Sequence, residues 1–180
     1  FGTISGVCDA PIEELTRTKG ITQNVAILLK LIPQLSRHYI NTQTSDKERI
    51  YDTNSAMRII SPQFIGRKNE MVVLVLMDSK NRVLYCGVVT EGNVNTVPLY
   101  IRKIITLAAT YNAAEAIIAH NHPSGNVMPS PGDIIATRKL NAAMETIDVH
   151  LQDHIIFGYP DYLSMKDCGL LAHILKPENQ

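Results

Sequence analysis

A nearly continuous apolar run, EMVVLVLM, begins at Glu70 and constrains the fold more than any other stretch of the sequence. It is followed by the polar segment DSKN and then by the β-rich run RVLYCGVVT. Two β-rich runs joined by a short polar segment are typical of a hairpin. We therefore expect a β-hairpin whose turn lies at residues 78–81.

Helices and strands alternate after this hairpin. Residues 98–111 have helical periodicity, with four apolar residues mostly on one face: Ile101, Ile104, Ile105 and Leu107. AEAIIAH predicts a short strand that ends at the histidines, IIATRKLNAAMETI a second long helix, and LQDHIIFG and YLSM the closing strands. This order predicts an α/β layered domain with a mixed sheet.

The N-terminal part is expected to be helical. PIEELTRT predicts a short helix with Pro11 in its first turn, and TQNVAILLKLIPQL predicts a longer one. The apolar stripe expected to face a small core on the longer helix consists of Val25, Leu28, Leu29 and Ile32. Ser45 and Glu48 form a capping-box pattern for a further helix through about Ile59.

Composition and charge narrow the function classes. The chain has 180 residues, 45% of them hydrophobic, which suffices for one domain with a good core plus a small addition. Its 17 basic and 17 acidic residues cancel, so bulk electrostatics do not favour nucleic acid.

Location is inferred from the cysteines and from the apolar segments. Cys8, Cys86 and Cys168 are scattered without a CxxC pair, which favours free thiols and a cytoplasmic protein. No apolar run approaches the ~18 residues of a membrane span, so no membrane partner is expected. Because the chain begins with Phe1 rather than Met, we expect an upstream segment.

The segment HNHPSGNVMPSPGD, residues 120–133, holds the chemistry. His120 and His122 project from the same face of a strand, because residues i and i+2 do so. With Asp133 returning from the next helix they supply three ligands, the number found in a catalytic zinc site that keeps one position for water. SPGD is also a good helix start, with Ser130 as N-cap, and the two interpretations are compatible because Asp133 in the first turn can point at a metal.

The same residues carry a family resemblance. His120, His122 and Asp133 resemble the JAMM metalloprotease motif, in which HxHP and SxxD are separated by a six-residue loop, here SGNVMP. The string HNHPSGN resembles the RadC family, whose members attach a JAMM (MPN) domain to an N-terminal helix-hairpin-helix. EGNVNTVPLYIRKI and DHIIFGYPDYLSM are further similarities, so the resemblance covers nearly the whole chain.

The resemblance implies a domain plan, a fold and an activity. A helix-hairpin-helix-like segment is expected in residues 1–40, a linker and helix in residues 41–62, and a JAMM/MPN domain of cytidine-deaminase-like α/β fold in residues 63–180. The implied activity is zinc (Zn²⁺)-dependent hydrolysis of amide bonds in a peptide or protein substrate. A deaminase would need H-x-E and P-C-x-x-C, which are absent, and an HNH nuclease motif is dispersed rather than consecutive.

A zinc hydrolase needs a base close to the attacking water. JAMM domains place this glutamate at the start of an apolar strand well upstream of the histidines, and Glu70 matches that context. Glu91 and Glu115 are the alternatives, both expected to be solvated or loop residues. Where RadC relatives often have His-Pro-Arg-Glu, this chain has YIRK at residues 100–103, which removes another candidate.

Two further roles stay open. Ser130 is predicted to be an N-cap and, from the resemblance, to help hold the oxyanion of a tetrahedral intermediate. The Asp153-His154 pair resembles a DH pair of the family, and we expect it to be structural or to support the metal ligands from behind. The other histidines are expected to be ordinary surface or core residues: His38, His150 and His173.

The segment TKGIT resembles a helix-hairpin-helix turn, in which glycine amides meet a DNA phosphate. Lys19, Gly20 and Ile21 are the candidate DNA contacts, whereas Thr22 replaces the second glycine. A small helical packing module is the alternative. For the whole chain, the alternatives to a metallopeptidase are a DNA-associated module of RadC type, as the family's DNA repair label suggests, and a scaffold with a non-catalytic metal site.

Overall fold

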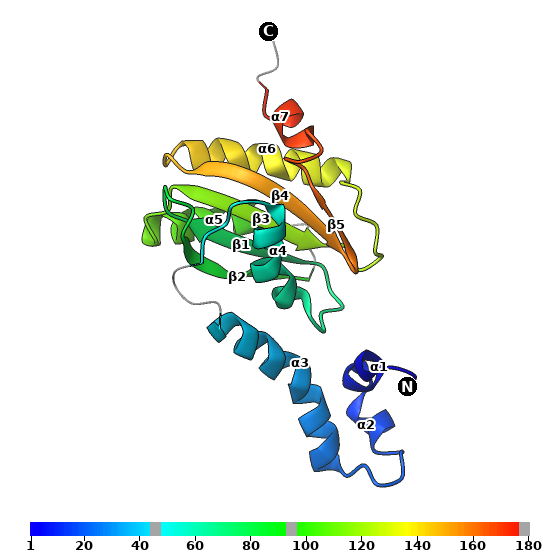
Figure 1. Ribbon diagram of the computed structural model, residues 1–180. Helices are drawn as coiled ribbons and strands as arrows, with labels where there is room; N and C mark the ends of the chain where they lie inside the picture. The colour runs from blue at the N-terminus through cyan, green and yellow to red at the C-terminus, as the bar shows by residue number, and fades with distance from the viewer. Residues whose placement is uncertain (44–47, 93–96, 177–180) are drawn as a thin grey trace.

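A computed structural model describes residues 1–43, 48–92 and 97–176, in which a helical N-terminal part precedes an α/β domain (Figure 1). The N-terminal part contains α1 (Ile4–Asp9), α2 (Ile12–Leu15) and α3 (Gln23–Gln43). The α/β domain contains, in chain order, α4 (Thr53–Ile60), the 3₁₀ helix η1 (Ser61–Phe64), β1 (Met71–Met77), β2 (Val83–Glu91), α5 (Val97–Thr110), β3 (Glu115–Asn121), α6 (Pro131–Glu145), β4 (His150–Gly158), β5 (Asp161–Ser164) and α7 (Leu170–Ile174).

The strands of the described residues form one mixed sheet in the order β2-β1-β3-β4-β5. Strand β1 pairs antiparallel with both β2 and β3, β3 pairs parallel with β4, and β4 pairs antiparallel with β5. The predicted hairpin and the predicted mixed α/β sheet are therefore confirmed. All 7 residues of β1 are buried, because this strand has a neighbour on each side and helices on both faces. Burial on both faces explains why its sequence is apolar without alternation.

Helices cover both faces of the sheet. On one face, α4 and η1 pack through Ile60 and Phe64 against Val75 of β1. On the other face, α5 and α6 pack through apolar side chains such as Ile104 and Leu140. Because side chains alternate along a strand, the even-numbered residues of β1 and β3 face α5 and α6. Helix α4 lies in front of the sheet in Figure 1, with α6 directly above the sheet in this view.

Helix α4 begins later than the sequence predicted. Asp52 is its N-cap, and the Ser55 side chain completes the capping box by accepting from the Asp52 backbone. The preceding residues are extended, because the Ile50 amide donates to the carbonyl of Asn81 in the turn before β2. The prediction of a helix that runs continuously from a cap at Ser45 is therefore wrong for residues 48–52, and Ser45 itself lies outside the described residues.

Helix α3 buries a different face from the predicted one. Ala26, which is fully buried, and Leu29, which is partly buried, pack against Leu15 of α2. The small side chain of Ala26 lets α1 and α2 approach on that side of α3. The expected stripe is wrong for its other members, which are exposed: Val25, Leu28 and Ile32.

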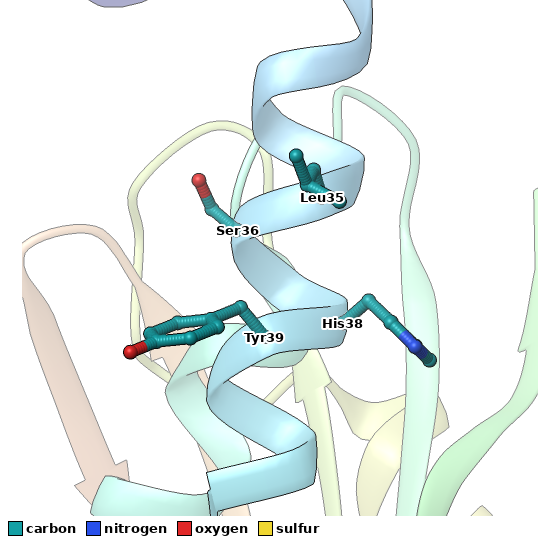
Figure 2. Close-up of a pocket in the computed structure, with 4 residues that line it drawn as sticks. All are labelled: Leu35, Ser36, His38 and Tyr39. Atoms are coloured by element: carbon teal, nitrogen blue, oxygen red, sulfur yellow. The ribbon is translucent and has the colours of Figure 1, made fainter.

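The C-terminal half of α3 is joined to the α/β domain. Arg37 donates a hydrogen bond to the carbonyl of Ile65, directly after η1. On the same stretch of α3, a hollow of about 380 Å³ is lined by Leu35, Ser36, His38 and Tyr39 (Figure 2). None of the predicted site residues lines this hollow. Within the described ranges, no helix combines the length and the apolar character needed to cross a membrane.

Candidate metal centre

The two histidines stand where β3 ends, and each is oriented by the nitrogen that faces away from the other. The Nε2 atoms of His120 and His122 lie 2.9 Å apart. The Nδ1 atom of His122 lies 2.6 Å from the carbonyl oxygen of Asn126 in the following loop. A carbonyl only accepts, so His122 donates its Nδ1 hydrogen there. In the neutral ring this leaves the Nε2 lone pair free to bind a cation.

Asp133 reaches the histidines from the first turn of α6. Its Oδ1 lies 3.3 Å from Nε2 of His120, and its Oδ2 lies 3.6 Å from Nε2 of His122. Ser130 is the N-cap, as predicted, and its backbone amide and its hydroxyl each donate to Oδ2 of Asp133 at 2.7 Å. The helix start and the orientation of the carboxylate are therefore one arrangement.

The electrostatic setting of Asp133 keeps its carboxylate ionised. Partial burial alone would raise the pKa of this group, but His120, which donates to the carboxylate when its ring is protonated, and the hydrogen bonds from Ser130 outweigh that effect. The pKa of Asp133 therefore lies well below its usual value of 3.8. An ionised carboxylate beside two imidazoles is an acceptor-only group, which suits a cation.

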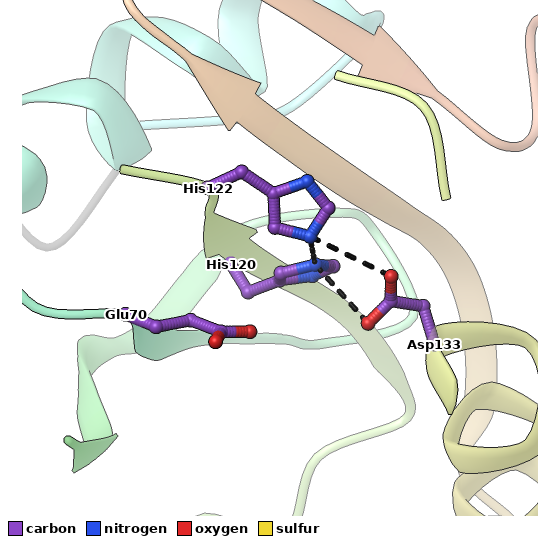
Figure 3. A group of neighbouring side chains, drawn as sticks. All are labelled: Glu70, His120, His122 and Asp133. Atoms are coloured by element: carbon purple, nitrogen blue, oxygen red, sulfur yellow. Dashed lines mark hydrogen bonds and ion pairs between the residues drawn. The ribbon is translucent and has the colours of Figure 1, made fainter. Parts of the chain in front are cut away.

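Glu70 completes the cluster from the residue immediately before β1. It lies on the sheet face of α5 and α6, because Glu70 and Val72 are two residues apart and Val72 pairs with His120. Figure 3 shows its carboxylate directed towards the two histidines, with Asp133 beyond them. One ligand atom from each of Glu70, His120, His122 and Asp133 can be chosen so that all lie within 4.8 Å of one another.

Asn121, between the two histidines, holds the chain around Glu70. Its side chain is buried and belongs to the opposite face of β3. Its Oδ1 accepts from the Met71 amide at 2.9 Å, and its Nδ2 donates to the Asn69 carbonyl at 3.1 Å. Both neighbours of Glu70 are therefore tied to β3. No local sequence pattern predicts this role of Asn121.

His120 also has a hydrogen-bond partner on the side of its ring that faces away from the cluster. Its Nδ1 lies 2.8 Å from Nε2 of His154 on β4, and Nδ1 of His154 lies 2.6 Å from the hydroxyl of Thr137 on α6. Burial, together with the neighbouring His120, holds the pKa of His154 well below its usual value, so this ring is neutral. Thr137 was missed by the sequence analysis, although its position one helical turn after Asp133 places it on the same face of α6.

Asp153, the other half of the pair, has a structural role on the opposite face of β4. Its carboxylate accepts from the hydroxyl of Ser164 at 2.5 Å and from the amide of Lys166 at 2.9 Å. Burial raises the pKa of Asp153, although these hydrogen bonds oppose the shift. Asp153 therefore fastens the turn after β5 to β4, as the structural interpretation expected.

The alternative glutamates lie outside the cluster. Glu91 forms a salt bridge with Arg67 at 2.7 Å. Glu115 pairs with His150 at 2.8 Å, at the start of β3 and thus at the opposite end of the strand from the two histidines. His150 is thus a surface histidine with a partner that the sequence analysis did not foresee.

The turn between α2 and α3 contains none of these groups. Gly20 has a φ of 91°, in the region that favours glycine. Ile21 packs with the small helical core, Lys19 is exposed, and the hydroxyl of Thr22 accepts weakly from the Val25 amide at 3.4 Å. Thr22 therefore caps α3, as its side chain allows.

The donor set of the cluster fits a divalent metal ion. Two imidazole nitrogens and a carboxylate suit zinc and the neighbouring transition metals, and a second carboxylate lies beside them. In the neutral His122 ring the single N–H hydrogen lies on Nδ1 and is donated to the Asn126 carbonyl. His122 Nε2 and the Asp133 carboxylate therefore face each other with lone pairs and no hydrogen between them. The group is a candidate metal site by its chemistry as well as by its shape.

Known proteins with similar sequences match most of this chain. A sequence model of the RadC-like JAB domain family matches residues 50–170. A UPF0758 protein of Idiomarina loihiensis is 33% identical over 171 residues, which cover 95% of this chain and 76% of that protein. A UPF0758 protein of Actinobacillus pleuropneumoniae is 30% identical over 167 residues, with 93% of this chain and 76% of the relative covered. One of Pseudoalteromonas translucida is 30% identical over 169 residues, with 94% and 75% covered.

Proposed function

The chain belongs to the RadC-like JAB domain family, and from this premise we propose that it is a zinc-dependent hydrolase of peptide or isopeptide bonds. Hydrolases occur in the JAB/MPN superfamily, which makes the class consistent with the family. In this proposal His120, His122 and Asp133 hold the zinc ion, and Glu70 moves the proton.

One observation carries the proposal. Glu70, His120, His122 and Asp133 come from three separate segments of the chain, yet one ligand atom from each lies within 4.8 Å of the others. Three of them supply the ligand number of a catalytic zinc site, which leaves a coordination position for water. The fourth, Glu70, is a carboxylate of the same cluster that is then left to act on that water as a base.

Zinc and Glu70 have different roles in the proposed hydrolysis. When bound, zinc would supply a Lewis acid that lowers the pKa of water towards about 7. The Glu70 carboxylate takes the proton of the attacking water and later gives it to the leaving amine. Ties from Asn121 to Asn69 and Met71 keep the backbone of Glu70 fixed during both transfers.

Ser130 has a defined contact and a proposed second one. Its hydroxyl hydrogen is directed to Asp133, which keeps that carboxylate facing the histidines. We propose that the same hydroxyl turns to the developing oxyanion of the substrate when the site is loaded, as in JAMM enzymes. Its exposure to solvent leaves room for that rotation.

The test is Glu70→Gln, assayed on a peptide library and on isopeptide-linked substrates with zinc-loaded protein. The amide is nearly isosteric and still hydrogen-bonds, but it cannot accept the proton. We expect zinc content and thermal unfolding to stay as in the parent, whereas turnover falls by ~10²–10⁴-fold or more.

Glu115→Gln is the matched control, because its carboxylate pairs with His150 at the other end of β3. It should leave turnover near that of the parent. Full activity of Glu70→Gln together with loss of activity in Glu115→Gln would overturn the assignment. Loss of zinc from Glu70→Gln would instead make this residue a ligand and remove the proton-transfer role.

A further inference from the structure

We propose that His154 and Thr137 are positioning residues that fix which nitrogen of His120 faces the metal. The importance of this positioning for catalysis rests on the proposed function, whereas the hydrogen-bond geometry does not depend on it. Three contacts form one continuous chain. His120 Nδ1 lies 2.8 Å from His154 Nε2, His154 Nδ1 lies 2.6 Å from Thr137 Oγ1, and that hydroxyl donates to the Asp133 carbonyl at 2.6 Å.

The direction of the chain is set at its far end. The Asp133 carbonyl has no hydrogen, so the single hydrogen of the Thr137 hydroxyl must point to it. This back-bond from a helical threonine to the carbonyl four residues earlier is a common geometry. The Thr137 oxygen can then only accept from His154, which places a hydrogen on Nδ1 of His154.

The hydrogen on Nδ1 of His154 in turn determines where His120 carries its hydrogen. A neutral imidazole with its hydrogen on Nδ1 offers a lone pair at Nε2. Nε2 of His154 therefore accepts from His120, and His120 carries a hydrogen on Nδ1. The Nε2 lone pair of His120 is thereby aimed at the centre of the cluster, where Nε2 of His122 and Oδ1 of Asp133 lie.

The burial of the chain makes this arrangement consequential. His120, Thr137 and His154 are 3%, 1% and 5% exposed, so water is not on hand to replace a lost partner. Thr137 also joins two parts of the site, because it lies one turn after Asp133 on α6 and contacts the β4 histidine behind His120. Partners that fix the tautomer of a metal-binding histidine typically change metal affinity 10–100-fold when removed.

The test compares Thr137→Val with Thr137→Ser. Valine keeps the shape of threonine but cannot accept from His154, whereas serine keeps the hydroxyl. Zinc affinity is measured by competition with a chromophoric chelator, and ring protonation by ¹⁵N NMR of the histidine side chains in metal-free protein at neutral pH. Thermal unfolding is recorded for each protein.

We expect the parent to carry a hydrogen on Nδ1 of both His154 and His120. In Thr137→Val the His154 hydrogen should move from Nδ1 to Nε2, and zinc affinity should fall 10–100-fold, while Thr137→Ser stays within a few-fold of the parent. His154 with its hydrogen on Nε2 in the parent would overturn the inference. So would Thr137→Val with unchanged zinc affinity, or an equal loss in Thr137→Ser.

Failure of the proposed function is separable from failure of this inference. A parent protein that binds no zinc contradicts the metal site, while the NMR spectrum of the same sample still decides the direction of the hydrogen-bond chain. If Thr137→Val does not fold, the parent spectrum and Thr137→Ser carry the test, because an Nε2 hydrogen on His154 in either protein contradicts the chain.

Discussion

Asn121 lies between His120 and His122 in sequence, but its side chain is on the opposite face of β3. Its amide group satisfies the Met71 N–H and the Asn69 carbonyl, on either side of Glu70. A buried backbone group that loses its partner costs about 1–3 kcal/mol. Leucine has a similar volume to asparagine but neither a donor nor an acceptor.

We therefore expect Asn121→Leu to lower the free energy of unfolding by about 1–3 kcal/mol in urea denaturation. Asn141→Leu is the control, because the Asn141 side chain donates to the exposed Glu145 four residues along α6, at 2.8 Å, and not to a distant segment of backbone. That change should stay within about 0.5 kcal/mol of the parent. Equal stability of Asn121→Leu and the parent would show that these two hydrogen bonds do not hold the Glu70 segment.

At this scale, the sequence reveals residues whose role follows from local spacing. His120 and His122 share a face because strands repeat every two residues, and Asp133 falls in a helix start that the SPGD letters announce. Asn121 and Thr137 are different, because each acts on a segment distant in sequence. Their partners depend on sheet register and on how α6 packs, which no local pattern encodes.

The turn between α2 and α3 contains the residues predicted from the sequence to contact DNA. Gly20 has the positive φ that the turn requires, but Thr22 caps α3 where a glycine would let a phosphate approach closely. Lys19 and Arg17 are exposed cations close to it in sequence. We therefore propose that any contact of this turn with a DNA phosphate is small.

We expect DNA association through this turn to be weak and independent of sequence, in the ~10⁻⁴–10⁻⁶ M range of non-specific binding. Fluorescence anisotropy with a labelled duplex, repeated at rising salt, measures it. Lys19→Ala should weaken binding further, whereas His120→Ala should not. Tight binding that survives high salt would contradict this prediction, because phosphate contacts weaken steeply as salt rises.

Helix boundaries and helix faces were the less predictable features of the elements. The start of α4 was misplaced because residues 48–50 pair with the β-hairpin, a tertiary contact that overrides a local capping pattern. The buried face of α3 was misjudged because apolar residues occur on several of its sides. Ala26, the smallest of them, marks the close approach of α1 and α2.

For the whole molecule, sheet order is what assembles the candidate site. β1 and β3 are adjacent although β2 and α5 lie between them in sequence, and their register sets Val72 opposite His120. Glu70 therefore lies close to His120, which is 50 positions later in the chain. The apolar run predicts β1, and the family resemblance predicts that Glu70 acts together with the histidines. The strand register that brings these residues together depends on packing and cannot be read from the sequence.

The central claim is that this sheet arrangement creates a zinc site. The most direct measurement is the zinc content of the purified protein by mass spectrometry after dialysis against metal-free buffer. Parent protein should hold about one zinc per chain. His120→Ala/His122→Ala should hold almost none while keeping its fold by circular dichroism, because the remaining ligands bind zinc poorly. His38→Ala/His173→Ala, at two exposed histidines outside the cluster, should bind like the parent. Full zinc occupancy in His120→Ala/His122→Ala would contradict the claim.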